Sequence, residues 1–177
     1  MKELIQLFTQ IALLRRGPQD LPASALLLWI SVVAYFGINA LVSSLMPPIE
    51  GWPAELTVDV VFTLVWYFVL LRVMGRSERI LQTTTAVFGF QAVLSPLLVI
   101  SNGLMARFAK DPTWQLPVAL IWLMLVIWLI AANSHVLKAA LEWSSTASVF
   151  LVILQIVVGQ IVLSALFPPQ LTAGPTS

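Results

Sequence analysis

Long runs of apolar residues, separated by short polar breaks, dominate this chain. A helix rises about 1.5 Å per residue, so about twenty apolar residues are needed to span a hydrocarbon core of about 30 Å. Five runs reach this length, and we place the predicted spans near residues 23–46, 57–74, 80–104, 114–133 and 145–167. Proline, glycine, asparagine and serine fill the breaks, as is typical of turns. The pattern predicts an all-α fold, a polytopic transmembrane bundle of five helices.

A shorter amphipathic pattern precedes the first span. Apolar residues recur there at helical spacing, at Leu4, Leu7, Phe8, Ile11 and Leu14. We expect a short helix on the membrane surface, with Arg15 and Arg16 near lipid phosphates. These arginines interrupt the apolar run and no small-residue cleavage site follows, so a cleaved signal peptide is not expected.

The lysines and arginines predict the orientation of the spans, because basic residues are enriched in cytoplasmic loops. A cytoplasmic N-terminus gives that side seven basic residues: Lys2, Arg15, Arg16, Arg72, Arg76, Arg79 and Lys138. The other side then holds two, Arg107 and Lys110. We therefore expect a cytoplasmic segment at residues 1–22, a transmembrane domain at 23–168 and a short outer-side tail at 169–177.

Composition supports a membrane protein and excludes several other classes. The 177 residues are 59% hydrophobic and 10% charged, and the mean hydropathy is +0.95. A net charge of +1 is too small for a nucleic-acid-binding surface. Without cysteine, the chain has no disulfides, thiolate nucleophiles or cysteine metal sites. Its compactness and lack of targeting signals favour a bacterial inner membrane.

The third predicted span carries an unusual set of polar residues. At 100° per residue, roughly, one stripe gathers Thr84, Gln91, Ser95 and Asn102. Pro96 lies in the same span and lacks an N–H, so it leaves the carbonyl of Ala92 without its usual helical partner. The fifth span carries a comparable stripe of Ser148, Gln155 and Gly159, and the first span carries Ser24, Ser31, Tyr35 and Asn39. These stripes are predicted to meet one another.

Two interpretations of the stripes stay open. Amide and hydroxyl groups hold membrane helices together through interhelical hydrogen bonds. Alternatively, a helix kinked at Pro96 opens a polar cavity or lateral groove for a lipid headgroup, a small solute or a partner helix. Because the amides carry no charge, an ion path along them is poorly supported.

Few titratable residues fall near the spans. Asp59 is expected either to start the second helix in a wet environment or to serve as a buried carboxylate that binds a cation or a basic partner. His135 is the only histidine, and we expect it in a surface loop rather than as a metal ligand. Arg72, Arg76 and Arg79 either fix the topology or form a small basic patch for anionic lipid.

Catalytic signatures are missing from the sequence. It has no glycine-rich phosphate loop, no histidine–glutamate zinc motif, no nucleophile elbow and no pair of carboxylates within a span. With one histidine and no cysteine, a nucleophile and its base are hard to assemble. We expect no enzymatic activity, no cofactor and no metal.

The third span, QTTTAVFGFQAVLSPLL, resembles the corresponding helix of the Yip family of five-span membrane proteins. Gly89-Phe90 and Pro96 stand where that family carries a glycine–aromatic pair and a proline. The stretch from Ala119 to Ile156 is similar to the family's fourth and fifth helices. The resemblance, over about residues 20–167, implies a non-enzymatic helix bundle.

The leading hypothesis is a Yip-like scaffold or accessory protein that associates laterally with itself or with a membrane complex. The polar faces of the third and fifth spans would form the interface. The alternative is a small transport or channel component, or a lipid-binding protein, with a cavity beside Gln91, Pro96 and Gln155. Membrane lipids are expected partners in each case.

Overall fold

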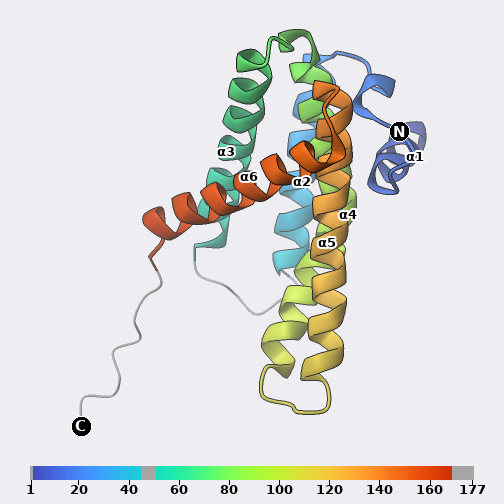
Figure 1. Ribbon diagram of the computed structural model, residues 1–177. Helices are drawn as coiled ribbons and strands as arrows, with labels where there is room; N and C mark the ends of the chain where they lie inside the picture. Colours follow the sequence, from blue (N-terminus) through green and yellow to red (C-terminus); the bar gives the residue numbers. More distant parts are fainter. Residues whose placement is uncertain (1, 45–50, 169–177) are drawn as a thin grey trace.

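The computed structural model describes residues 2–44 and 51–168, and in this part of the chain the regular structure is entirely helical. Six α-helices and two short 3-10 helices follow one another (Figure 1). The α-helices are α1 (Lys2–Ala12), α2 (Ala25–Ser44), α3 (Trp52–Val73), α4 (Ile80–Phe108), α5 (Gln115–Leu141) and α6 (Ser145–Leu166). The 3-10 helices are η1 (Pro18–Asp20) and η2 (Ser77–Arg79). The predicted all-α class is confirmed.

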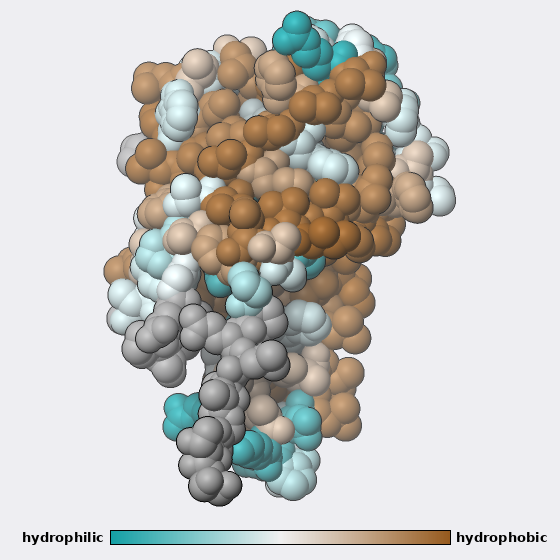
Figure 2. All heavy atoms as spheres, turned by 90° about the vertical axis from the view of Figure 1, so that its left-hand side faces the viewer, coloured by the Kyte–Doolittle hydropathy of each residue, from teal (hydrophilic) through white to brown (hydrophobic). Residues whose placement is uncertain are grey.

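The five helices from α2 to α6 are long and apolar enough to cross a membrane, which confirms the five predicted spans. The side of the molecule on which α3 and α6 lie shows mainly hydrophobic side chains, with hydrophilic residues at the top and bottom of the molecule (Figure 2). An apolar belt between two polar ends is the surface that a bilayer requires. The chain is therefore a helical membrane protein.

Helix α4 forms the centre of the bundle. It packs against α1, α2, α3 and α5, and 61% of its span is buried, against 22% for α2 and α3. All eight residues from Thr83 to Phe90 are buried, so this part of α4 is covered on every side. A helix enclosed in this way is expected to lack a strong amphipathic pattern.

Helix α6 has a different position from the other spans. Helices α2 to α5 run roughly along one direction, whereas α6 crosses that direction obliquely (Figure 1). It packs against α5 and α3, and 11% of its span is buried, the same share as for α5. Because α4 and α6 do not pack extensively on each other within the described residues, their polar stripes do not form a common interface.

The ends of the helices correct several predicted boundaries. Helix α5 continues to Leu141, although we expected a turn from Asn133. The Asn133 amide donates to the Leu129 carbonyl at 3.2 Å, and the Ser134 hydroxyl donates to the Ala131 carbonyl at 3.0 Å. These contacts satisfy the polar side chains on the helix itself, so they do not end it.

The remaining boundaries differ by smaller amounts. Helix α3 begins at Trp52, directly after Gly51, because Pro53 is favourable in the first turn of a helix. Helix α4 passes through Pro96 without interruption and ends at Phe108, four residues beyond the predicted 104. The last two residues of the first predicted span and the predicted tail at 169–177 lie outside the described residues.

The predicted amphipathic helix is present as α1, but its apolar face packs on the protein. Ile11 and Ala12 are buried in the main hydrophobic core, and Leu4, Leu7 and Phe8 pack against that core. The predicted apolar face is correct for Leu4, Leu7, Phe8 and Ile11, whereas Leu14 lies beyond the end of α1 and is exposed. The sequence did not show that α4 and α5, rather than lipid, cover this face.

Candidate functional site

Polar contacts join α2 to its two neighbours inside the bundle. The Tyr35 hydroxyl of α2 donates to the Asp59 carboxylate of α3 at 3.0 Å. One turn further along α2, the Asn39 amide donates to the Ser95 hydroxyl of α4 at 2.9 Å and to the Tyr35 carbonyl at 2.8 Å. The polar stripe of the first span therefore meets the second and third spans.

The position of Asp59 is intermediate between the two that we considered, a wet residue at the helix start and a buried carboxylate. Asp59 lies two turns inside α3, is half-buried and contacts Tyr35, so it is not an exposed residue at the helix start. Among the described residues no lysine or arginine forms an ion pair with it. The structure thus gives Asp59 a role in joining α2 and α3.

The polar stripe of α4 is divided among several neighbours. Thr84 is buried and its hydroxyl donates to the Ile80 carbonyl at 2.6 Å. Ser95 is buried and donates to the Gln91 carbonyl at 2.7 Å while it accepts the bond from Asn39. Such bonds satisfy hydroxyl groups that would otherwise be exposed to an apolar environment.

The C-terminal end of the α4 stripe contacts α5. The Trp122 indole N–H donates to the Asn102 side-chain oxygen at 2.6 Å. Pro96 and Gln91 are half-buried, and no hydrogen bond within the described residues involves the Gln91 amide. Thr84, Ser95 and Asn102 are therefore used inside this chain.

The stripe of α6 also faces the protein. Ser148 and Gln155 are buried, and the Ser148 hydroxyl donates to the Ser144 carbonyl at 3.1 Å. A Cβ atom at Gly159 would lie 3.1 Å from the Phe62 ring of α3, so the glycine permits a close approach of the two helices. This placement assigns the predicted α6 stripe to packing on α3 and α5.

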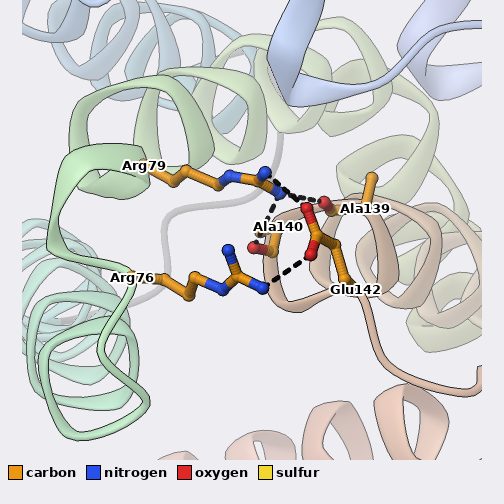
Figure 3. A network of polar contacts seen from close by, with 5 residues as sticks. All are labelled: Arg76, Arg79, Ala139, Ala140 and Glu142. Carbon is orange, nitrogen blue, oxygen red and sulfur yellow. Dashed lines mark hydrogen bonds and ion pairs between the residues drawn. The ribbon is translucent and has the colours of Figure 1, made fainter.

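An ion-pair cluster connects the start of α4 with the end of α5 (Figure 3). Arg76 and Arg79 each bind one oxygen of Glu142 at 2.6 Å. Arg79 also donates to the carbonyls of Ala139 and Ala140, at 2.8 and 3.1 Å. The guanidinium thus satisfies free carbonyl groups at the C-terminus of α5. The hydrogen bond from Arg79, with the charges of both arginines, lowers the pKa of Glu142.

The five arginines that we predicted to contact lipid headgroups fall into two groups. Arg76 and Arg79 are engaged within the protein by Glu142. Arg15, Arg16 and Arg72 are exposed and form no ion pair within the described residues, although Arg72 lies over the Phe68 ring at 5.6 Å. The second group remains accessible to lipid headgroups.

Three hydrogen bonds hold the N-terminal segment against the bundle. The Trp128 indole N–H donates to the Ala12 carbonyl at 2.7 Å, and the Gln82 amide donates to the Leu21 carbonyl at 2.7 Å. His135 Nε2 lies 3.1 Å from the Arg16 carbonyl oxygen. A carbonyl only accepts hydrogen bonds, so Nε2 carries the proton in this contact.

The sequence did not predict these contacts. The position of His135 also differs from the one that we expected. His135 lies within α5 and is half-buried, not in a surface loop. The acceptors are backbone carbonyls, which carry no residue-specific signal. Trp122 and Trp128, which lie well inside α5, contact α4 and α1 through their indole N–H groups.

Two neighbouring grooves lie at the end of α5 that contacts the N-terminal segment. One, of about 300 Å³, is lined by His135, Lys138, Ala139, Glu142 and Trp143. The other, of about 410 Å³, is lined by Leu14, Ile127, Ile130, Ala131, Ser134, His135, Lys138, Ser145 and Val149. Neither groove is lined by Gln91, Pro96 or Gln155, where we predicted a cavity.

Comparison of this chain with protein-family models, with curated proteins and with solved structures finds no match. The resemblance to the Yip family stays a prediction. Within the described residues, no group of three or more histidine, aspartate or glutamate side chains is placed to hold a metal ion.

Proposed function

We propose that this chain is a non-enzymatic, Yip-like scaffold or accessory protein of a bacterial inner membrane, which associates laterally with itself or with another membrane protein. The proposal rests on the outward face of α6. The buried residues of α6 face α3 and α5. We therefore assign the association surface to the exposed residues of α6 and not to its predicted polar stripe.

The single observation that supports this function is an exposed amide within a span. Gln160 and Ser164 are exposed on α6 and are four residues apart, so they lie on one helical face. Ile153 and Val157 continue the same face and are also exposed. An amide in hydrocarbon without a hydrogen-bond partner is unfavourable by several kcal/mol, roughly, and a partner helix would satisfy it.

The transport alternative has less support from the geometry. The polar residues beside Pro96 contact other helices of the chain, and the two grooves lie elsewhere. Lateral association requires no continuous polar path through the bundle.

The absence of cysteine allows a direct test of self-association. Gln160→Cys introduces a single thiol on the proposed face, and mild oxidation in native membranes would give a disulfide-linked dimer. Leu123→Cys is a matched control, because Leu123 is also exposed and lies about as far from the middle of α5 as Gln160 lies from the middle of α6. Equal cross-linking of both variants, or none at Gln160→Cys, would contradict self-association.

A second arm tests association with another protein. A photo-reactive residue at position 160 would cross-link a membrane protein in native membranes if the partner is not a second copy. Gln160→Leu should weaken either association, by about 1 kcal/mol for the loss of an interhelical hydrogen bond. If neither arm gives a specific adduct, the proposed function fails.

A further inference from the structure

The larger groove combines an apolar part and a polar part along one stripe of α5. Ile127, Ile130 and Ala131 line it toward the middle of the helix, and Ser134 and Lys138 line it toward the end. Leu14 borders it from the N-terminal segment, and Val149 from α6. Three elements distant in the sequence therefore border one open, amphiphilic groove.

The length of the groove matches one leaflet of a bilayer. The eleven residue steps from Ile127 to Lys138 correspond to about 16 Å of helix. Half of the hydrocarbon core is about 15 Å. A lipid chain that lies along Ile127 and Ile130 would thus place its headgroup at the level of Lys138.

The charges at the polar end favour an anion. Lys138 donates to the Ser145 hydroxyl at 2.9 Å and forms no ion pair within the described residues. Arg15 and Arg16, which follow the lining residue Leu14, are exposed and also form no ion pair there. Glu142 lines the adjacent groove, but Arg76 and Arg79 bind its carboxylate. The polar end therefore keeps a net positive charge.

We propose that this groove binds an anionic phospholipid, with an acyl chain along Ile127, Ile130 and Val149 and the phosphate beside Lys138 and Ser145. The lipid would contact both the N-terminal segment and the start of α6, and would hold them together on α5. The inference does not depend on lateral association through Gln160.

The test compares lipids retained by the full-length protein in native mass spectrometry. The protein is released from nanodiscs that contain equal amounts of phosphatidylglycerol and phosphatidylcholine. We expect one retained lipid, with a clear preference for phosphatidylglycerol. A basic residue near an anionic lipid contributes about 1 kcal/mol, so Lys138→Gln should lower this preference about fivefold. Lys110→Gln, at the other end of the bundle, is the matched control.

A second variant and a competitor test the apolar part of the groove. Ala131→Trp should fill the space beside Ile127 and reduce retention of the lipid, while the protein still unfolds cooperatively. Glycerol phosphate has no acyl chain and should not displace the lipid.

Three results would overturn the proposal. One is equal retention of the two lipids by the unaltered protein. Another is an equal loss in Lys138→Gln and Lys110→Gln, and the third is full displacement by glycerol phosphate. Lys138 is exposed, so its substitution tests the proposal even if Ala131→Trp does not fold.

Discussion

Helices α4 and α6 have similar polar patterns in the sequence but different roles in the structure. Each is an apolar span with hydroxyl and amide side chains on one face. Helix α4 is enclosed by four other helices, whereas α6 contacts α3 and α5 and leaves most of its surface exposed. A polar stripe thus shows that a helix face has a partner, but it does not show whether the partner belongs to the same chain.

In both helices a glycine lets an aromatic ring of a neighbouring helix approach closely, but the space left at the two glycines differs. At Gly89 of α4, a Cβ atom would overlap the Phe8 ring of α1. At Gly159 of α6, a Cβ atom would be only slightly too close to the Phe62 ring of α3. The central helix tolerates less additional volume than the peripheral one, because its neighbours surround it.

The strongest destabilisation is predicted for truncation of a buried phenylalanine in α4, compared with truncation of an exposed one in α6. Phe90 is fully buried in the core, whereas Phe150 on α6 is 66% exposed. Phe90→Ala should lower the free energy of unfolding by about 3–5 kcal/mol. Phe150→Ala should change it by less than about 1 kcal/mol in the isolated chain. Reversible unfolding in mixed micelles, followed by tryptophan fluorescence, measures both values. Similar losses would show that α6 is packed as tightly as α4.

The two glycines give the next largest difference. Gly89→Ala should displace Phe8 and lower the free energy of unfolding by about 1–3 kcal/mol. Gly159→Ala should have a smaller effect, because the gain in helix propensity of about 0.5–1 kcal/mol offsets the crowding. The same unfolding assay applies, with limited proteolysis between residues 13 and 22 as a readout of α1 release. Phe8→Ala should restore stability to Gly89→Ala, and a lack of rescue would exclude this contact as the cause.

The smallest effect is expected at the ion-pair cluster that joins the start of α4 to the end of α5. The pKa of Glu142 is lowered in the folded protein, so the cluster stabilises the fold above the unfolded pKa of about 4.3. This stabilisation is lost as the pH falls through the folded pKa. Glu142→Gln should remove that part of the acid sensitivity, and high salt should weaken it because the groups are exposed.

Glu78→Gln is the matched control for the cluster. Glu78 lies in the same turn, is exposed and forms no ion pair within the described residues. Its substitution should leave the pH dependence of unfolding unchanged. If both variants change the loss of stability at low pH equally, general charge repulsion and not the ion-pair cluster determines that loss.

Part of the candidate site could be read from the sequence. The polar residues of the first span, Tyr35 and Asn39, were expected to meet other spans, and they contact Asp59 and Ser95. The exposed pair Gln160 and Ser164 was missed, although an amide in an apolar run was a visible signal. The groove beside Lys138 had no signal of its own, because its residues come from three separate elements.

The pattern of apolar and polar residues was sufficient to predict an all-α membrane protein with five spans and an amphipathic N-terminal helix. These properties depend on local hydropathy and on helical periodicity, which are fixed within each segment. The packing of the helices placed α4 at the centre of the bundle and brought α1 against Gly89. Those outcomes depend on the rotation and contact of separate helices, which the periodicity of a single helix does not specify.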